Sequence, residues 1–561
     1  MPSLRSSIVA GFLLPLVFAA TALAQDYDLA IVNGRVIDPE TMLDAVLNVG
    51  VKDGRIAAVT GQPISGEETI DATGLVVSPG FIDTHFHALD GLAVRLAALD
   101  GVTTGMDLEI GSSMVPEWYA TKEGAWPLNY GTCASHELAR MMIHDPEVDM
   151  SQVIDATTVF AKRAESGKDG VQGWSVTRSS LEQMNKINAL IDEGLRQGGL
   201  CVASTVGYAR EGITTYEMFE AQRTGARYGR PLALHARLHG NNSTPYEAQL
   251  GFAEVFTNAA LLKAPLLYMH DNDYGWWEIE EKLQLARAQG LNMWSEYYPY
   301  DSAATAISAV FLQPETWEES WGYKYEETIY DPYQDKYLPK DEFLQTAKEH
   351  PDRTVIVFNP NRKKWINYWV RMPHMTVAAD SMWSGMSWDA KLTDYLGHPR
   401  TAGTHGRTFE LARQEGVPLM FTIAQMSYWP AKHLGDAGLE AMQERGRLQT
   451  GMIADITIFH AEAVRSPATY KVGEQGLPTE GIPYVIVGGQ QVVKAGEFQM
   501  GVWAGAPIRY PVEAEGRFEP ASAAKWVDDN AIRTIGPIID SSGSSESVIQ
   551  LHRDMATNGA N

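Results

Sequence analysis

Short alternating runs of apolar residues occupy both ends of the chain and predict β-strands there. Residues 25–80 and 441–510 each contain several such runs, separated by turn signals such as Asn33-Gly34, Asp53-Gly54 and Gly488-Gly489. Each segment is too short to bury a hydrophobic core by itself. We therefore expect the two segments to combine into one small β-sandwich domain.

The longer region between them, residues 81–440, alternates apolar strand candidates with helical segments such as residues 214–228 and 277–289. Eight strand–helix units predict an α/β fold, the (β/α)8 or TIM barrel, whose active site forms at the carboxyl ends of the strands. An open, doubly wound sheet is the alternative that this alternation leaves. The strands are expected to begin near Phe81, Gly101, Leu128, Leu200, Pro231, Pro265, Leu291 and Met375.

Two segments fall outside this pattern. Residues from about 314 to 345 are acidic and aromatic and follow the seventh strand, where a long insertion usually forms a lid or a binding loop. Residues 511–561 form a C-terminal tail with a Ser/Gly run at 541–545, and we assign no chemistry to this tail.

The first 24 residues have the organisation of a secretory signal peptide. Arg5 precedes an apolar run at residues 8–20, and Ala22-Leu23-Ala24 is a small-x-small cleavage site. Cleavage near Ala24 would release a periplasmic or secreted protein. An N-terminal membrane anchor is the alternative, but the apolar run is short for a membrane span. No later stretch is long and apolar enough for one, so we expect no membrane association in the mature chain.

Composition narrows the class of protein further. With 45% hydrophobic residues in 561, the chain is a folded globular protein larger than one hydrophobic core normally supports. Its formal net charge of −25 repels nucleic acid, so we expect no nucleic-acid partner. For the two cysteines, Cys133 and Cys201, we expect buried free thiols, with a single disulfide as the alternative. A homo-oligomer is compatible with the sequence.

The strongest chemical signal is the run Pro79-Gly80-Phe81-Ile82-Asp83-Thr84-His85-Phe86-His87 at the end of the first barrel strand. The two-residue period of a strand puts His85 and His87 on one face, where both imidazoles can reach one cation. His-x-His alone is a weak signal, and a pair of exposed histidines is then the default interpretation. Directly after a first barrel strand, the motif predicts metal ligands.

Three further candidates also end predicted strands: His235, His270 and Asp380. Any one of them alone is more often a structural cap or a satisfied polar group. A barrel brings the ends of strands one, five, six and eight into one mouth, so the four histidines and Asp380 together predict a zinc site with one or two divalent ions. Beside such an ion, Asp380 would accept a proton from water and return it to a leaving amine.

This combination of motifs resembles the amidohydrolase superfamily over residues 27–496, and within it the N-acyl-D-amino-acid deacylases, or D-aminoacylases. The resemblance implies a metal-dependent hydrolase that cleaves the amide bond of a small N-acyl amino acid with metal-activated water. The residues that carry the likeness are 32–38, Gly101-Val102-Thr103-Thr104, Tyr298-Pro299-Tyr300, His398-Pro399-Arg400, 451–455, Ala468-Thr469-Tyr470 and 480–487.

The sequence departs from the D-aminoacylase pattern at two places. D-aminoacylases have a Cys ligand shortly after the Gly-Val-Thr-Thr strand, where this chain has none, and Glu109 is our first choice to replace it. Other superfamily members use a carboxylated Lys on the fourth strand, and residues 200–208 contain no Lys. Glu109 is therefore the first choice for a bridging or terminal carboxylate, and Glu137 is the second. A carboxylate that merely caps the strand end is the alternative. D-aminoacylases also have a Lys closely after the sixth-strand His, where this chain has Asp271 and Asn272.

Three residues are candidates for substrate contacts. Arg237, two residues past His235, is the candidate partner of a substrate carboxylate, with a structural ion pair as the alternative. Tyr297 or Tyr298, at the end of the seventh strand, would donate to the carbonyl oxygen. The aromatic insertion would close over an apolar acyl group.

Two other functions are compatible with these motifs. A periplasmic dipeptidase or prolidase-like amidohydrolase would need an anionic pocket for a free amino terminus, for which Asp271 and Asp273 are candidates. A non-catalytic metal- or ligand-binding protein of the same fold would have no need of an acid–base group such as Asp380. The sequence lacks a Gly-x-Ser-x-Gly nucleophile elbow at a strand–helix turn, so a serine mechanism has little support.

Overall fold

The computed structural model describes residues 26–168, 170–237, 245–273, 275–531, Gln550 and 553–555. One compact unit ends at Phe518, and a second, short unit begins at Glu519 and contains helix α17 (Ala523–Asn530). The predicted signal peptide and the Ser/Gly run at 541–545 lie outside the described residues.

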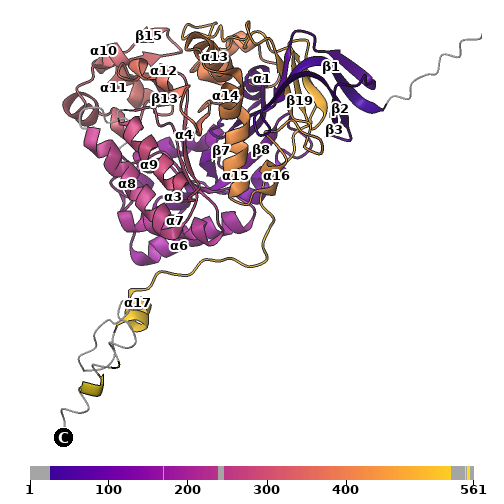
Figure 1. Cartoon of the computed structure of the whole chain (residues 1–561). Coiled ribbons are helices and arrows are strands. Elements are labelled where there is room, and N and C mark those ends of the chain that lie inside the picture. Colours follow the sequence, from indigo (N-terminus) through magenta and orange to yellow (C-terminus); the bar gives the residue numbers. More distant parts are fainter. Residues whose placement is uncertain are drawn as a thin grey trace, which may run out of the picture. The chain divides into compact units, whose positions relative to one another are not determined.

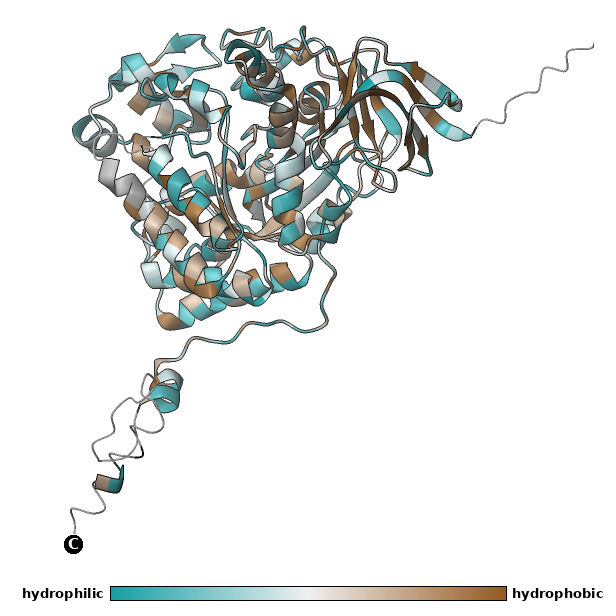
Figure 2. Ribbon diagram, in the orientation of Figure 1, coloured by the Kyte–Doolittle hydropathy of each residue, from teal (hydrophilic) through white to brown (hydrophobic). Residues whose placement is uncertain are grey.

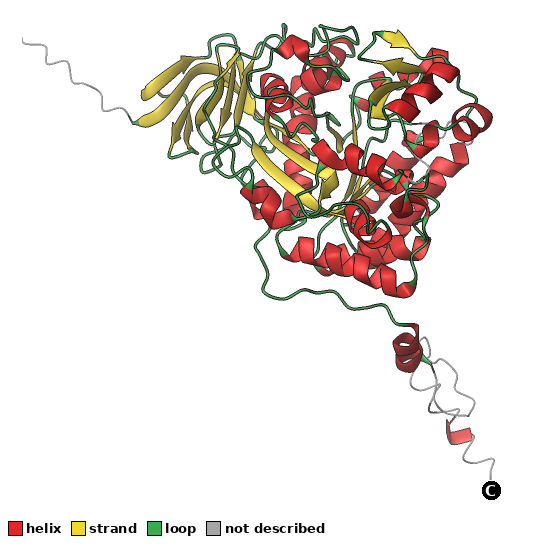
Figure 3. Ribbon diagram, turned by 180° about the vertical axis from the view of Figure 1, so that it is seen from behind, coloured by secondary structure: helices red, strands yellow, loops and turns green. Residues whose placement is uncertain are grey.

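Eight parallel strands form one sheet in the order β17-β12-β11-β10-β9-β8-β7-β6 (Figures 1 and 3). The neighbours follow chain order with no reversal, and a parallel bridge between Phe86 and Ser381 connects the ends of the first and last strands. The predicted barrel is confirmed, and the doubly wound sheet is excluded because that fold reverses its strand order. The strands are β6 (Phe81–Asp83), β7 (Val102–Ser112), β8 (Asn129–Ser135), β9 (Val202–Ser204), β10 (Leu232–Leu234), β11 (Leu266–Tyr268), β12 (Met293–Tyr297) and β17 (Met375–Val377).

Every residue of these eight strands is buried, as expected for parallel strands that are covered on both faces. The helices around them carry apolar and polar residues on different faces (Figure 2). Within the described ranges, none of the helices has the length and apolar character of a membrane span. The helices are α1 (Gly91–Leu99), α2 (Val115–Ala120), α3 (His136–His144), α4 (Ala156–Ser166), α5 (Gly173–Val176), α6 (Leu181–Arg196), α7 (Thr215–Arg227), α8 (Pro245–Leu262), α9 (Trp276–Ala288), α13 (Arg400–Gln414), α14 (Leu419–Ile423), α15 (Trp429–Asp436) and α16 (Glu440–Gln443).

The segments before and after the barrel strands together form a nine-stranded sheet. Its order is β21-β20-β19-β18-β5-β1-β2-β3, with β4 paired to β1. Strand β18 pairs antiparallel with β5, with Ile456 opposite Pro79 and Phe459 opposite Val76. This pairing confirms that segments from both chain ends build one small β structure beside the barrel. Its strands are β1 (Tyr27–Asp38), β2 (Leu43–Lys52), β3 (Arg55–Thr60), β4 (Gly66–Asp71), β5 (Val76–Pro79), β18 (Ile456–Phe459), β19 (Tyr484–Val487), β20 (Gln490–Lys494) and β21 (Glu497–Phe498).

Between β12 and β17 the chain forms a folded insertion with a four-stranded antiparallel sheet, ordered β13-β16-β14-β15. Trp317 and Phe343 belong to an apolar cluster of its own. The insertion covers residues 302–358, which is wider than the predicted 314–345, because the flanking runs pair with each other as β13 and β16. Its elements are β13 (Ser302–Ala306), β14 (Ile329–Asp331), β15 (Lys336–Tyr337), β16 (Thr354–Phe358), α10 (Tyr325–Thr328) and α11 (Lys340–Glu349), and α12 (Ile366–Trp369) follows.

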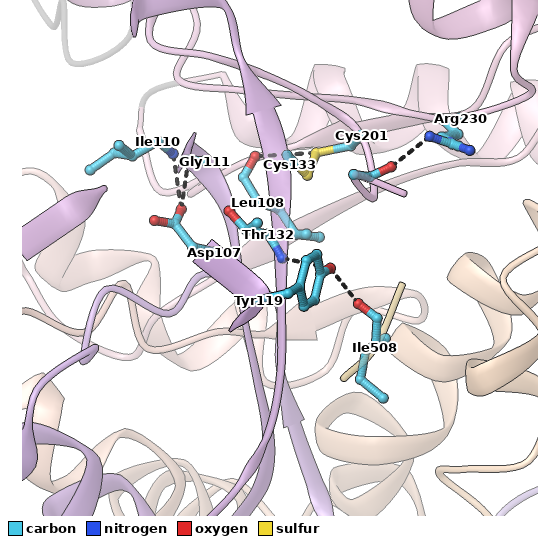
Figure 4. Close-up of a disulfide and its surroundings, with 11 residues drawn as sticks. Asp107, Leu108, Ile110, Gly111, Tyr119, Thr132, Cys133, Cys201, Arg230 and Ile508 are labelled. Carbon is cyan, nitrogen blue, oxygen red and sulfur yellow. Dashed lines mark hydrogen bonds between the residues drawn. A yellow bond between two sulfur atoms is a disulfide. The ribbon is translucent and has the colours of Figure 1, made fainter. Parts of the chain in front are cut away.

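Cys133 and Cys201 form a disulfide that joins two neighbouring barrel strands (Figure 4). The parallel register places Ala134 opposite Val202, so the two preceding cysteines lie side by side with Cα atoms 4.7 Å apart. The expectation of two free thiols is therefore wrong. The cysteines are 68 positions apart in the sequence, and the apolar pattern does not contain the register that brings them together.

We expect the disulfide to contribute about 4 kcal/mol to the free energy of unfolding, because it closes a 68-residue loop in the unfolded chain. A variant with Cys133→Ser and Cys201→Ser should therefore unfold at a lower temperature than the oxidised wild type in scanning calorimetry. The wild type denatured without reductant should show no free thiol, and two thiols after reduction. Two reactive thiols before reduction would contradict the disulfide.

Candidate metal centre

The six side chains predicted as ligands converge at the carboxyl ends of the barrel strands. They follow β6, β10, β11 and β17 or lie within β7. In each of two groups, the ligand atoms lie within 4.8 Å of one another. The first group is His85, His87, Glu109 and Asp380, and the second is Glu109, His235 and His270.

The Glu109 carboxylate belongs to both groups and connects them. Its Oε2 atom lies 3.1 Å from His85 Nε2 and 3.2 Å from His87 Nε2. Its Oε1 atom lies 3.0 Å from His270 Nε2 and 3.3 Å from His235 Nδ1. Each oxygen thus faces one histidine pair, which is the arrangement of a carboxylate between two ligand sites.

The spacing of these atoms fits a small divalent ion. Bonds of about 2.0–2.1 Å to zinc place tetrahedral ligand atoms about 3.3 Å apart. His235 Nδ1 and His270 Nε2 are 3.1 Å apart, and His85 Nε2 lies 3.3 Å from Asp380 Oδ1. Despite these neighbours, no well-directed hydrogen bond within the described residues satisfies the buried His85 Nε2. The residues therefore fit one or two divalent ions.

The carboxylates of the site favour positive charge among the histidines. Burial lowers the pKa of His87, but Asp107 and Glu109 outweigh burial and raise that pKa to about 9. Burial also opposes charge on His85, yet the fields of Asp380 and Glu109 raise its pKa well above the ordinary value. A divalent cation meets the same anionic field, because metal binding to histidine displaces the protons that would otherwise bind there.

Glu296 is a site residue that the sequence analysis missed. Its Oε1 atom accepts a hydrogen bond from His85 Nδ1 at 2.6 Å, and its Oε2 atom accepts one from the Thr84 hydroxyl at 2.7 Å. A carboxylate on the second ring nitrogen fixes the ring, so that His85 Nε2 faces the ligand cluster. Glu296 lies within the buried strand β12, and a charged residue inside such an apolar strand is the signal that could have identified it.

Two further residues orient the predicted ligands. Asp107 Oδ2 is 3.4 Å from His87 Nδ1, while Asp107 Oδ1 accepts hydrogen bonds from two backbone N–H groups of its own strand (Figure 4). Arg400 Nη2 is 2.9 Å from Asp380 Oδ1, and Arg400 is fully buried. Asp107 thus orients His87, and Arg400 orients Asp380. Arg400 belongs to the His398-Pro399-Arg400 motif, which the sequence analysis noted only as a family likeness.

Two of the predicted ligands lie in strained backbone. His270 and Asp380 have positive φ angles of 35° and 48°. Residues other than glycine pay a conformational cost in this region, and such residues cluster at functional sites. Beside them, Gly207 permits a close approach, because a Cβ atom there would lie 2.2 Å from His235 Cδ2.

The ligand cluster opens into a cavity with an empty volume of about 850 Å³, part of it open to solvent. The described lining includes five of the predicted ligands, two arginines and a wall of aromatic side chains, several of them from the insertion. The aromatic residues are Phe160, Tyr208, Tyr298, Phe311, Trp317, Trp321, Tyr323 and Trp383, and the arginines are Arg163 and Arg362.

Of the two tyrosines proposed to contact the substrate, Tyr298 lines the cavity and Tyr297 does not. The Tyr298 hydroxyl accepts a hydrogen bond from Arg362 Nη1 at 2.7 Å. Tyr297 is fully buried, and its hydroxyl donates to Gln425 Oε1 at 3.3 Å. Consecutive residues of a strand point to opposite faces, so only one of the pair can face the barrel mouth. The assignment of Tyr297 to the site is therefore corrected.

Arg237 also lies away from the described cavity lining, contrary to the prediction. Its Nε and Nη2 atoms each lie 2.9 Å from a Glu254 oxygen, and Nη1 donates to the Ile213 carbonyl at 2.8 Å. Strand β10 ends at Leu234, so the two-residue alternation does not extend as far as Arg237. The structure shows the alternative, a structural ion pair.

The remaining acidic candidates are engaged elsewhere. Glu137 makes two hydrogen bonds of 2.7 Å with Arg163 and lies outside both ligand groups. Asp273 binds Arg362 at 2.9 Å and 3.1 Å. Burial raises the pKa of Asp271 well above its ordinary value. Neither Asp271 nor Asp273 is among the described residues that line the cavity, so they do not form the anionic pocket that a dipeptidase would need.

Comparison with known proteins agrees with this geometry. The D-aminoacylase of Alcaligenes xylosoxydans xylosoxydans is 25% identical over 514 residues, which cover 84% of this chain and 95% of that protein. The N-acyl-D-glutamate deacylase of Bordetella bronchiseptica, solved with zinc and a phosphonate inhibitor, has a TM-score of 0.67 at 20% identity, covering 86% of this chain and 100% of that one. The chain is thus similar to D-aminoacylases in sequence, and its fold matches those of solved N-acyl-D-amino-acid deacylases.

A solved D-aminoacylase has a TM-score of 0.65 at 21% identity, and it covers 86% of this chain and 100% of its own. No protein-family model matches the chain. The chain therefore shares the fold of these proteins at low sequence identity. The residue that lies between the two histidine pairs in this chain is Glu109.

Loss of the Glu296 carboxylate should weaken zinc binding about 10- to 100-fold, because His85 would lose the group that fixes its ring. Competition with a chelator measures this affinity in the Glu296→Gln variant. Glu280→Gln is the matched control, since the buried Glu280 hydrogen-bonds Ser295 and lies outside both ligand groups. An equal loss of affinity in both variants, or no loss in Glu296→Gln, would contradict the orienting role.

Proposed function

We propose that the protein is an exported hydrolase that cleaves the amide bond of N-acyl amino acids, with Asp380 as its acid–base residue. The observation that carries the proposal is the position of Glu109, whose two oxygens each face one histidine pair, with Asp380 Oδ1 3.3 Å from His85 Nε2. A metal centre with an adjacent carboxylate, at a cavity lined by aromatic side chains, suits amide hydrolysis. The likeness to the Alcaligenes xylosoxydans xylosoxydans D-aminoacylase supports N-acyl amino acids as the substrate class.

Each polar group of the site has a chemical task in this reaction. A divalent ion, when bound, supplies an activated water and polarises the amide carbonyl. The four histidines and Glu109 would hold such ions. Asp380, which Arg400 orients, accepts the proton of the attacking water and returns it to the leaving nitrogen. Tyr298 accepts a hydrogen bond from Arg362, so its own proton is available to the carbonyl oxygen.

The aromatic wall of the cavity supports the proposal that the substrate carries a large apolar group. Phe311 comes from the insertion, and its ring centroid lies 5.3 Å from that of Tyr208, which in turn lies 4.8 Å from that of His235. Trp321 extends the wall at 6.2 Å from Phe311. Apolar surface buried against these rings contributes about 25 cal/mol per Å² to binding before the costs of association. The insertion is thus suited to close over an apolar acyl group.

Export is part of the proposal. The signal-peptide organisation of the first 24 residues motivates it. The Cys133–Cys201 disulfide supports it, because structural disulfides persist mainly in oxidising compartments such as the periplasm or the extracellular space.

The alternative functions have less support. A dipeptidase needs acidic groups for a free amino terminus, and Asp273 is instead bound to Arg362. A protein that only stores metal has no use for Asp380 beside the ligands or for a wide aromatic cavity. Neither alternative is favoured by an observation of its own.

The zinc-loaded wild type should release free amino acid in a screen of N-acyl-D-amino acids, N-acyl-L-amino acids and dipeptides. The Asp380→Asn variant should lose about 10²- to 10⁴-fold in kcat, because the proton transfer loses its acid–base group. Metal analysis of the same samples should show that the variant still binds zinc. Full activity in Asp380→Asn would contradict the acid–base role, and activity on dipeptides alone would favour the dipeptidase.

Removal of the carboxylate between the histidine pairs should lower metal content. If the wild type binds two ions, an anionic group must offset their mutual repulsion. The zinc content of Glu109→Ala, measured by elemental analysis, should then fall toward one ion per chain. Glu137→Gln is the matched control, since Glu137 lies outside both ligand groups, and it should keep the wild-type zinc content. A Glu109→Ala variant that keeps two ions and full activity would show that Glu109 does not hold metal.

A further inference from the structure

A substrate carboxylate needs a cationic partner in the cavity, and the predicted one is engaged elsewhere. Arg237 is bound to Glu254 and does not line the described cavity. Where D-aminoacylases have a Lys closely after the sixth-strand His, this chain has Asp271 and Asn272. Apart from histidines, the cations among the described lining residues are Arg163 and Arg362.

Each nitrogen of Arg362 already donates a hydrogen bond to another residue. Its Nε and Nη2 atoms bind the two oxygens of Asp273 at 2.9 Å and 3.1 Å. Its Nη1 atom donates to the Tyr298 hydroxyl at 2.7 Å. Arg362 therefore holds the insertion side of the cavity against the loop after β11, and the charge of its guanidinium is already paired with Asp273.

Arg163, on α4, is bound through only two of its three nitrogens. Nε and Nη2 each lie 2.7 Å from an oxygen of Glu137, which also accepts a hydrogen bond from the Thr205 hydroxyl. The Arg163 Cζ atom lies 4.3 Å from the centroid of the Tyr208 ring, which fixes the guanidinium further. Nη1 makes no hydrogen bond with the described residues, and Arg163 lines the same cavity as His87 and Glu109.

The distance from Arg163 to the ligand cluster suits an N-acyl amino acid. Tyr208 contacts both, since its ring centroid lies 4.3 Å from Arg163 Cζ and 4.8 Å from the His235 centroid, so Arg163 Cζ lies within about 9 Å of the His235 ring. By standard bond lengths, the carboxyl carbon of an N-acyl amino acid lies about 3–4 Å from its scissile carbonyl carbon. With about 2 Å from an oxygen to an ion and about 2.8 Å from a carboxylate to a nitrogen, the molecule spans this gap.

We infer that Arg163 binds the free carboxylate of the substrate through Nη1, so that this hydrolase selects amides of amino acids whose carboxylate is ionised. The inference rests on the proposed amide hydrolysis and names the specificity residue of that reaction. Glu137 makes the guanidinium rigid, so little side-chain entropy is lost when a carboxylate binds. Arg163 stays charged there: burial lowers its pKa, but Glu137 outweighs burial and raises it.

The test compares two substrates that differ only in charge: N-acetylphenylalanine, as the enantiomer that the wild type cleaves, and its primary amide N-acetylphenylalaninamide. Acetate release gives kcat/KM for each. The wild type should prefer the carboxylate by about 10- to 100-fold, as expected for one charged hydrogen bond. Arg163→Lys should bring this ratio close to one, mainly through KM of the acid, because one ammonium cannot serve both Glu137 and a ligand.

A second variant guards against misfolding. In Glu137→Gln with Arg163→Gln both charges are removed, so no unpaired buried charge is left, and the ratio should again approach one. Arg237→Lys is the matched control, since Arg237 is also an arginine paired with a glutamate but lies outside the described lining, and its ratio should equal that of the wild type.

The outcomes separate this inference from the function on which it rests. A wild type that cleaves N-acyl amino acids but keeps its preference in both Arg163 variants overturns the role of Arg163 alone. The same holds if the variants lose activity equally on both substrates, or if the wild type does not distinguish them. A zinc-loaded wild type that cleaves neither substrate, nor any N-acyl amino acid of the screen, overturns the proposed function and this inference with it.

Discussion

The attraction between one buried carboxylate and four histidines is the interaction on which the site depends. Burial opposes the charge of Glu109, but the surrounding histidines outweigh burial and hold its pKa well below the ordinary value. An unpaired carboxylate at this depth would cost several kcal/mol, so the fold accommodates Glu109 because histidine nitrogens surround both of its oxygens. The barrel meets this condition because its parallel strands all end at one mouth, where side chains from β6, β7, β10, β11 and β17 come together.

The features that could be predicted from the sequence are those that depend on local periodicity. Eight apolar runs were enough to predict the barrel. The two-residue period of a strand was enough to predict that His85 and His87 lie side by side. The missed Glu296 and the missed disulfide share one physical cause, which is that contacts between distant strands leave no local pattern. Glu296 reaches His85 across 211 positions, and the disulfide depends on the register of β8 and β9. The prediction for Arg237 failed for a different reason: it extended the two-residue alternation of β10 beyond Leu234, the last residue of that strand.

The insertion could be predicted as an aromatic segment but not as a folded unit. Its length and its position after the seventh strand suggested a lid or a binding loop, whereas Trp317, Trp321 and Tyr325 belong to a core that includes residues of β14, β16 and their helices. Packing in this core makes the cavity wall a rigid surface, because an aromatic residue held by its neighbours cannot simply swing away. The ion pair of Arg362 with Asp273 ties the chain after β16 to the barrel. A buried pair of this kind fixes geometry more than it adds stability.

Reactive groups and specificity groups come from different parts of this fold. The metal ligands and Asp380 lie at strand ends, where the barrel fixes them, and two of them occupy strained backbone. Arg163, Tyr208 and the aromatic wall come from α4, the turn after β9 and the insertion, which lie outside the strands. Because these segments do not set the strand register, their residues can change without moving the ligands. In the proposed role of Arg163, a cation from α4 that Glu137 holds at the cavity wall serves where the loop after β11 has Asp271 and Asn272.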